Sequence, residues 1–340
     1  MKIQNKKFLT SPSDLNNFVS CKYLIQNEIK FLYKEIKRNE ESIDQKLWKE
    51  FGIKHEKKHF DLLKKYYKKN ISIKQDLTEE ERNKKTLEAI NKGYDLIYHA
   101  YLIEGDFRGE ADFLIKVDNA SDLGNFSYEV YDTKVSRKPR PRHIYQITAY
   151  SSMLSKIQGI LPDKMYLIDG ADITHQYKPK EFIDFYNFTK KNFDKYLKNI
   201  TKEKIYPEKS SHCGVCDYTD ECEKIWTEDN YINQVAKINR SQVEKLKKIG
   251  INTVEKLAST NPEKIKVKIN KQALKDRISQ AQLQEEKRET GKSKYIILDP
   301  DKGKGFYKLP KPDEGDLFFD IEGYPQEDGR GFEYLHGLYF

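Results

Sequence analysis

The chain has 340 residues, of which 37% are hydrophobic and 12% aromatic, so it is long and apolar enough for a sizeable core and two or three domains. Charged residues make up 34% of the chain and the mean hydropathy is −0.86. No apolar run reaches the length of a membrane span, and the N-terminus has no signal-peptide apolar region. We therefore expect a soluble, cytoplasmic protein without a membrane partner. The net charge of +8 permits an anionic partner, but on charge alone a solvated lysine-rich surface is the simpler explanation.

Helix and strand signals alternate through the first two thirds of the chain. "SPSDLNNFVSC" predicts a helix that is capped by Ser11 or Ser13. The other predicted helices cover residues 43–67, 78–93, 142–157 and 179–200. Strands are predicted at "LIYHAYLIEGDF", "RGEADFLIKVD", "SYEVYDTKVS", "KMYLIDG" and "ITHQYK". This order of helix, strands, helix and strand predicts a mixed α/β fold with a central sheet.

The composition changes after the last cysteine. Residues 229–290 predict a small helical domain. Residues 291–340 begin with a linker rich in Pro, Gly and Lys over about 298–315, and "DLFFDIEGYP" then predicts a new buried strand. We therefore expect domains at 1–228, 229–290 and 291–340.

Several polar residues fall at positions where strands and a helix would bring them together. In "YEVYDTKVS", strand alternation places Asp132 and Lys134 on one face. A carboxylate beside an ammonium suits metal binding and the stabilisation of an attacking hydroxide, although for this motif alone an ordinary surface ion pair is the better explanation. Asp112 lies on the preceding strand, and Gln146 and Tyr150 are spaced i, i+4 on the following helix.

Taken together, these motifs resemble the RecB-family nucleases of the PD-(D/E)xK superfamily over about residues 10–228. The ordered set is His55, G-x-x-D (Gly109, Asp112), D-x-K (Asp132, Lys134) and Q-x-x-x-Y (Gln146, Tyr150). The resemblance implies a restriction-endonuclease-like core, with a mixed sheet flanked by helices, that hydrolyses phosphodiester bonds. The family usually has a glutamate where this chain has Asp132.

The resemblance also implies a role for each residue. Mg²⁺ or Mn²⁺ would be held by His55, Asp112, Asp132 and the backbone carbonyl of Thr133. The metal would polarise the scissile phosphate and lower the pKa of a bound water. Lys134 would position that water and offset the developing charge. Gln146 and Tyr150 would orient the lysine and the phosphate.

The four cysteines are Cys21, Cys213, Cys216 and Cys222, and the last three form C-x2-C-x5-C. In a reducing compartment this arrangement indicates metal or cluster ligation rather than disulfides. On spacing alone, structural Zn²⁺ is a serious alternative, although zinc ribbons usually carry two C-x-x-C pairs and this chain has one. One early and three late cysteines resemble the 4Fe–4S staple of AddB-type and CRISPR-associated RecB-type nucleases, which implies a structural cluster.

"HEKKH" at residues 55–59 matches H-E-x-x-H, the motif of a zinc peptidase helix. Such a peptidase needs a third ligand downstream and usually has apolar inner positions. Here the inner positions are Lys57 and Lys58, and no convincing downstream Glu or His is evident. We therefore expect no peptidase, with Glu56 and His59 on the helix surface or behind the ligand His55.

Two segments are candidates for DNA contact. In "SRKPRPRH", phosphate contacts by Arg137, Lys138, Arg140 and Arg142 and a solvated loop are equally good explanations. "LKKIGINTVEKLAST" resembles a helix–hairpin–helix element in which amides at Gly250 would hold a phosphate, and a plain helical segment explains it equally well.

The last segment, "DLFFDIEGYP", resembles the first motif of DnaQ-like exonucleases of the RNase H-like superfamily, with Asp320 and Glu322 as metal carboxylates. The further carboxylates of such a site are missing. We therefore expect the chain to be the front part of a longer protein that continues with RNase H-like and possibly helicase domains.

The function that follows from these expectations is an iron–sulfur-containing, metal-dependent DNase that acts on single-stranded DNA or DNA ends in repair or foreign-DNA processing. One alternative is a CRISPR-associated nuclease that trims DNA before spacer integration, although such proteins usually end soon after the cysteines. Another is an inactive DNA-binding or scaffold module of a larger helicase–nuclease.

Overall fold

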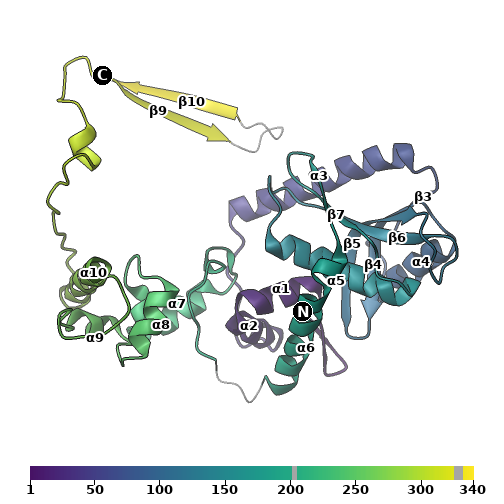
Figure 1. Ribbon diagram of the computed structural model, residues 1–340, viewed down its shortest axis with the longest axis horizontal. Coiled ribbons are helices and arrows are strands. Elements are labelled where there is room, and N and C mark those ends of the chain that lie inside the picture. Colours follow the sequence, from purple (N-terminus) through teal and green to yellow (C-terminus); the bar gives the residue numbers. More distant parts are fainter. Residues whose placement is uncertain (201–204, 325–331) are drawn as a thin grey trace. The chain divides into compact units, whose positions relative to one another are not determined.

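The structure is a computed structural model, which describes residues 1–200, 205–324 and 332–340 (Figure 1). The chain divides into two compact units, Met1–Cys222 and Glu223–Phe340, and each is described here by itself.

The first unit is built on a six-stranded sheet with the order β3-β4-β5-β6-β7-β8. Its strands are β3 (Asn70–Ser72), β4 (Leu96–Glu104), β5 (Phe107–Val117), β6 (Ser127–Thr133), β7 (Met165–Ile168) and β8 (Thr174–Tyr177). Pairing is parallel for β3–β4 and β6–β7 and antiparallel elsewhere. The central strands are apolar on both faces, as expected for a sheet that is covered on both sides.

Helices flank this sheet. They are α1 (Pro12–Ser20), α2 (Lys22–Leu32), α3 (Ile43–Tyr66), α4 (Glu79–Asn91), α5 (Pro141–Gln158) and α6 (Ile183–Asn199). Ser11, Ser42 and Thr78 cap α1, α3 and α4 with capping boxes, which explains where these helices begin. Helix α5 makes the crossover between the parallel strands β6 and β7 and is buried along most of its length.

Two hydrophobic clusters hold the layers together. The larger cluster joins the strands to α1, α2, α4, α5 and α6 through residues such as Leu15, Ile90, Ile147 and Phe193. The smaller cluster packs Phe60 of α3 against Leu96, Tyr98, Phe113 and Ile115 of β4 and β5. Helix α3 therefore packs on strand residues outside the larger cluster.

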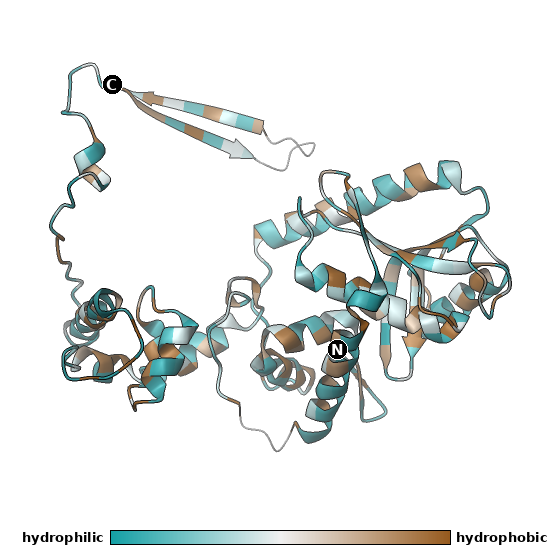
Figure 2. Ribbon diagram, viewed as in Figure 1, coloured by the Kyte–Doolittle hydropathy of each residue, from teal (hydrophilic) through white to brown (hydrophobic). Residues whose placement is uncertain are grey.

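The second unit contains a small helical region and a hairpin. Helix α7 (Thr219–Glu228) leads into it, and α8 (Arg240–Lys247), α9 (Val254–Ala258) and α10 (Lys271–Thr290) follow. Buried Val243, Leu246, Leu257, Leu274 and Ile278 lie in these helices. Strands β9 (Phe318–Tyr324) and β10 (Phe332–Tyr339) pair only with each other among the described residues, and apolar residues occur along both (Figure 2).

The predicted α/β fold with a mixed sheet flanked by helices is confirmed, and so is the small helical region within residues 229–290. Helix α2, strand β3 and the N-terminal hairpin β1 (Lys2–Gln4) and β2 (Lys7–Leu9) were not predicted. The predicted strand at Phe318 forms, but the expectation that it is buried is wrong: its residues are exposed because a two-stranded hairpin covers neither of its faces. Cys21 lies at the junction of α1 and α2 rather than inside a helix.

None of the helices in the described ranges is long and apolar enough to cross a membrane.

Candidate active site

Two carboxylates and an ammonium group meet where β6 ends beside β5. The Asp132 side chain is fully buried and forms an ion pair with Lys134, which lies just beyond the last residue of the strand. Asp112 Oδ2 accepts hydrogen bonds from the Thr133 amide and the Thr133 hydroxyl, each at 2.7 Å. Asp112 is therefore fixed to the residue that lies between Asp132 and Lys134.

This group contains more carboxyl groups than cations to balance them. Burial raises the pKa of Asp112, and the nearby charges of Asp132 and Glu56 raise it further. Burial also raises the pKa of Asp132, against the lowering effect of Lys134. Burial alone would lower the pKa of Lys134, but Asp132 and Asp112 outweigh it and raise the pKa. The carboxyl groups of Asp112, Asp132 and Glu56 thus share the single ammonium group of Lys134, and this arrangement favours an additional cation.

Helix α5 places Tyr150 over the same group. The Gln146 Nε2 donates to the Tyr150 hydroxyl at 3.3 Å. Burial, followed by the charges of Asp132 and Asp112, raises the pKa of Tyr150, so the phenol stays protonated and can donate a hydrogen bond. A Cβ on Gly109 would lie 2.9 Å from Tyr150 Cε1 and 3.0 Å from Pro12 Cδ, so the tyrosine ring packs here because residue 109 has no side chain.

The backbone is distorted directly beside Asp112. His99 of β4 has φ of +57°, in the left-handed region that non-glycine residues avoid, and it lies between the paired residues Tyr98↔Phe113 and Ala100↔Ala111. The face of the strand changes at this point. Tyr98 and Phe113 belong to the cluster with α3, whereas Ala100 and Ala111, two residues away, belong to the larger cluster. Strain of this kind, on the order of 1–3 kcal/mol, is typical of functional positions.

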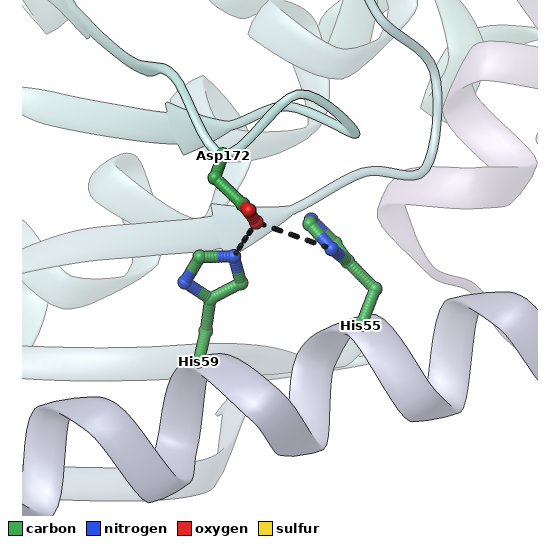
Figure 3. Close-up of side chains that lie close together, drawn as sticks. All are labelled: His55, His59 and Asp172. Atoms are coloured by element: carbon green, nitrogen blue, oxygen red, sulfur yellow. Dashed lines mark hydrogen bonds and ion pairs between the residues drawn. The ribbon is translucent and has the colours of Figure 1, made fainter. Parts of the chain in front are cut away.

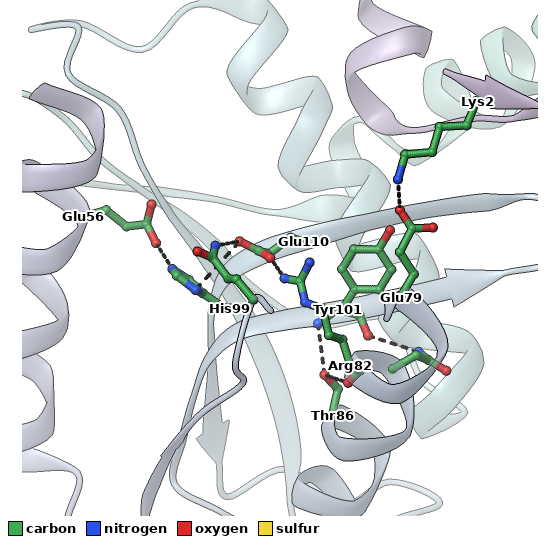
Figure 4. Close-up of polar contacts among 10 residues, drawn as sticks. Lys2, Glu56, Glu79, Arg82, Thr86, His99, Tyr101 and Glu110 are labelled. Atoms are coloured by element: carbon green, nitrogen blue, oxygen red, sulfur yellow. Dashed lines mark hydrogen bonds and ion pairs between the residues drawn. The ribbon is translucent and has the colours of Figure 1, made fainter. Parts of the chain in front are cut away.

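His99 also connects Glu56 to a polar network (Figure 4). The His99 Nε2 lies 2.6 Å from Glu56 Oε1, and its Nδ1 lies 4.0 Å from Glu110 Oε1. Glu110 in turn forms an ion pair with Arg82 of α4. The acidic residue of "HEKKH" is therefore directed to the sheet and to the carboxylate group.

The two histidines of "HEKKH" point from α3 to the turn between β7 and β8 (Figure 3). Asp172 Oδ1 lies 3.0 Å from His59 Nε2 and 3.9 Å from His55 Nδ1. Burial lowers the pKa of both histidines, which favours neutral imidazoles. Of the two positions expected for His59, on the helix surface or behind the ligand His55, the surface position is excluded because the residue is buried.

The structure thus separates residues that the resemblance places in one ligand set. In the parts of the chain that the structure describes, His55, His59 and Asp172 form the sole group of three or more potential ligands whose atoms lie within 4.8 Å of one another. His55 does not form such a group with Asp112 and Asp132. Its Nε2 is nevertheless buried without a hydrogen-bond partner among the described residues, so the predicted ligand set stays a prediction.

All four cysteines line one cavity, which also contacts Leu24 and His212. None of the four forms a disulfide, and burial together with Cys216, Cys21 and Cys213 raises the pKa of Cys222 to about 12. The cysteine segment is anchored on α2 and the residues that follow it, because Tyr218 donates to Glu28 at 3.1 Å and Arg38 Nε donates to the Tyr218 hydroxyl at 3.0 Å. The chain positions the thiols through side chains other than the cysteines.

The basic loop directly follows Lys134. Arg137, Lys138, Arg140 and Arg142 are exposed, and within residues 1–200, 205–324 and 332–340 no carboxylate forms an ion pair with Lys138, Arg140 or Arg142. His143 lies buried behind this loop. Burial and the neighbouring charges of Lys134, Arg142 and Arg140 lower its pKa to about 3.

The remaining candidate residues lie in the second unit. Gly250 has φ of +84° in the turn between α8 and α9, the conformation that a tight turn between two helices needs. Asp320 and Glu322 alternate along β9 and are exposed. These positions neither support nor contradict the DNA-binding and metal roles predicted for them.

Four residues near these groups were missed or undervalued from the sequence: Glu56, His99, His143 and Asp172. "HEKKH" contained a signal for Glu56, whose spacing from His55 and His59 is fixed by the helix. Nothing in the local sequence marks Asp172, because it lies 113 residues after His59 and reaches it through the β7–β8 turn.

The chain matches no protein-family model, and no curated protein is significantly similar to it. The function is therefore argued from the arrangement of its own residues.

Proposed function

We propose that the chain is a divalent-cation-dependent DNA nuclease of the RecB-family PD-(D/E)xK type, and that its first unit has a restriction-endonuclease-like core. The observation that carries the proposal is the buried group of Asp112, Asp132 and Lys134 at the end of β6, with Tyr150 and Gln146 of α5 beside it. The order α3, β4–β6, α5, β7 agrees with the helix, strands, helix and strand that the resemblance implies.

The residues fit a divalent cation. Asp132 Oδ1 and His55 Nε2 are buried atoms without a hydrogen-bond partner among the described residues. A carboxylate oxygen is a common ligand atom for Mg²⁺ and Mn²⁺, and an imidazole nitrogen favours Mn²⁺ over Mg²⁺. Asp112, Asp132 and the Thr133 carbonyl would hold the ion. His55, which forms no group with the two aspartates within 4.8 Å among the described residues, would have to move closer to serve as the further ligand. When bound, the ion supplies charge that polarises a phosphate and favours deprotonation of water.

The protein's own groups supply the rest of the chemistry. The Lys134 ammonium, paired with Asp132, can donate to the charge that develops on a phosphate oxygen. Tyr150 stays protonated and is a second donor, held in place by Gln146. Thr133 holds Asp112 through two hydrogen bonds, so this carboxylate needs little rearrangement on binding a cation.

Two surfaces suit a DNA strand. Lys138, Arg140 and Arg142 are exposed cations next to Lys134 that can contact phosphates. A groove over α1, the start of α2 and α6 is lined by Phe185, Phe188, Lys22 and Lys195, and the two phenylalanines are exposed. Exposed rings beside lysines allow unpaired bases to stack while phosphates pair with ammonium groups, which favours a single-stranded substrate.

Lys134→Ala tests this proposal. The variant should fold and bind end-labelled single-stranded DNA like the parent but cleave it at least about 100-fold more slowly with Mn²⁺, because it lacks the donor to the developing charge. Cleavage is measured on denaturing gels and binding by fluorescence anisotropy in Ca²⁺. Lys138→Ala is the control for loss of charge alone. Cleavage that survives Lys134→Ala would rule out this mechanism.

We also propose that the cysteines hold a 4Fe–4S cluster with a structural role. A tetrahedral zinc would place its sulfur ligands about 3.8 Å apart. Among the described residues, however, no three cysteine sulfurs lie within 4.8 Å of one another, although all four line one cavity. In a cluster, each sulfur binds a different iron, so wider spacing is acceptable.

Anaerobic purification tests the cluster. We expect a brown protein with about four irons per chain, as the four cysteines imply. Cys222→Ser should lose iron and lower the thermal midpoint, while Ser210→Ala at the rim of the same cavity should keep the iron. One zinc per chain and no visible absorption would contradict the proposal and support the zinc alternative.

A further inference from the structure

The side chains of His55, His59 and Asp172 form a group that the nuclease proposal does not require as a unit. The two histidines are one helical turn apart on α3, and Asp172 reaches them from the β7–β8 turn (Figure 3). The helix fixes the distance between the imidazoles, and the sheet fixes the position of the turn. The three residues therefore come from two rigid elements of the same unit.

The spacing suits a small transition-metal ion. An ion 2.0–2.2 Å from each ligand places neighbouring ligand atoms about 2.8–3.6 Å apart. Asp172 Oδ1 lies 3.0 Å from His59 Nε2, within this range, and 3.9 Å from His55 Nδ1, slightly outside it. All three ligand atoms lie within 4.8 Å of one another, so a small rearrangement of the imidazole rings would close the group on an ion.

The turn that carries Asp172 is organised before any ion binds. Asp169 Oδ1 accepts hydrogen bonds from the amides of Ala171 at 2.9 Å and Ile173 at 3.0 Å, and His175 holds Asp169 Oδ2 at 2.7 Å. Asp172 itself has φ of +63°, an unfavourable conformation for a residue other than glycine, which this turn maintains. Strained, well-held backbone at the tip of a turn is typical of functional positions.

The same geometry argues against peptidase chemistry. In an H-E-x-x-H peptidase the glutamate is a general base beside the metal. Here Glu56 is held by His99 at 2.6 Å and faces the Asp112 and Asp132 carboxylates. Glu56 is therefore engaged by His99 and lies toward the carboxylate group, where it does not act as the base beside an ion held by His55, His59 and Asp172.

We propose that His55 Nδ1, His59 Nε2 and Asp172 Oδ1 form a binding site for a first-row transition metal ion such as Zn²⁺. This ion is distinct from the Mg²⁺ or Mn²⁺ ion at Asp112 and Asp132, toward which His55 would use its other ring nitrogen, Nε2. Two imidazoles and one carboxylate select such ions over Mg²⁺, which prefers an all-oxygen environment. Lys58, whose ammonium lies 2.6 Å from Asp172 Oδ2, competes with the ion for this carboxylate. The proposal does not depend on nuclease activity.

Zinc binding to the full chain tests the proposal. The protein is purified anaerobically with its cysteine site loaded, held in excess Mg²⁺, and dialysed against buffered Zn²⁺; bound metal is counted by elemental analysis. The parent should bind one more Zn²⁺ than His59→Gln or Asp172→Asn, whose affinity at this site should fall at least about tenfold. Asp132→Asn should bind the same additional Zn²⁺ as the parent.

A variant that binds Zn²⁺ more tightly than the parent is a further test, because a misfolded protein would bind Zn²⁺ at this site more weakly. Lys58→Gln removes the competing ammonium from an exposed position, so it should bind Zn²⁺ about two- to fivefold more tightly. Unchanged binding in both Asp172→Asn and His59→Gln would overturn the proposal. Loss of the additional Zn²⁺ in Asp132→Asn would also overturn it, because the ion at His55 would then belong to the nuclease group. Loss of DNA cleavage in any of these variants tests the nuclease proposal and not the Zn²⁺ site.

Discussion

Asp112 is held beside a second buried carboxylate while the nearest ammonium, Lys134, is paired with that second carboxylate, Asp132. Thr133 compensates in part through two hydrogen bonds to Asp112. The strained His99 lies opposite in the β4–β5 ladder and binds Glu56, which adds a third negative charge nearby. At this scale, local strain and charge repulsion are concentrated at the proposed cation site.

Asp112→Asn should therefore stabilise the metal-free protein in a pH-dependent way. The pKa of Asp112 is higher in the folded protein than in the unfolded chain, so folding favours the protonated form of its carboxyl group. This contribution to the free energy of unfolding is complete below about pH 4, near the pKa of the unfolded chain, and it is lost as the pH rises through the higher pKa of the folded protein. Asparagine cannot ionise. The free energy of unfolding of the variant should thus exceed that of the parent by about 1–2 kcal/mol at pH 8 and by little near pH 4, measured by urea denaturation.

Mn²⁺ supplies the matching control for that experiment. It should stabilise the parent and not the variant, because only the parent keeps both carboxylates. An equal free-energy difference at pH 4 and pH 8 would show that repulsion at Asp112 is not the cause.

At the scale of elements, the site depends on how closely α5 packs on β5. Tyr150 of α5 lies over Gly109 of β5, and Pro12 at the start of α1 closes the same contact. The three elements meet in the larger cluster, which α5 joins along its whole length. The position of the Tyr150 hydroxyl near the carboxylates is thus set by a contact between helix and strand.

Gly109→Ala should disturb this contact. Its Cβ would meet the Tyr150 ring at 2.9 Å and Pro12 at 3.0 Å, so we expect a loss of about 1–3 kcal/mol in the free energy of unfolding and slower DNA cleavage.

Gly52→Ala is the matched control: residue 52 lies in α3 and a Cβ there meets only Val135 Cγ2 at 3.9 Å. That variant should be neutral or more stable by up to about 1 kcal/mol. Equal effects of the two substitutions would contradict the packing argument.

At the scale of the whole molecule, the β9–β10 hairpin differs from the rest. Phe318, Phe319, Leu335 and Leu338 are more than half exposed, whereas the sheet of the first unit is covered by helices. Among the described residues no further strand pairs with either edge of this hairpin. Such an edge, together with an exposed apolar surface, favours association with other molecules.

Removal of residues 316–340 should therefore reduce self-association without lowering the thermal midpoint of the remainder by more than about 1 °C. Light scattering coupled to gel filtration measures the first property and scanning calorimetry the second. A large drop in the midpoint would mean that the hairpin stabilises other parts of the chain.

The amino-acid sequence by itself determined most of the helices and strands of the first unit. Capping residues such as Ser11 and Ser42 and the apolar alternation of β4–β6 are local signals, and local signals suffice to place elements. The same alternation placed Asp132 and Lys134 together, and their ion pair agrees with it. The resemblance to the RecB-family motifs in their order along the chain also predicted that Asp112, Gln146 and Tyr150 lie near this pair. In the structure Asp112 is bonded to Thr133, and Gln146 is bonded to Tyr150.

Only the tertiary structure decided which residues His55 meets and how the strands change face. Asp172 reaches His55 and His59 through a turn more than a hundred residues downstream, a distance at which no periodic pattern carries information. At His99 of β4 and Asp112 of β5 the side chains change from one face of the sheet to the other. The regular alternation is interrupted there because His99 has a left-handed backbone conformation, which turns the following side chains to the other face. The exposure of β9 was likewise invisible locally, since burial depends on what packs against a strand and not on its own apolar residues.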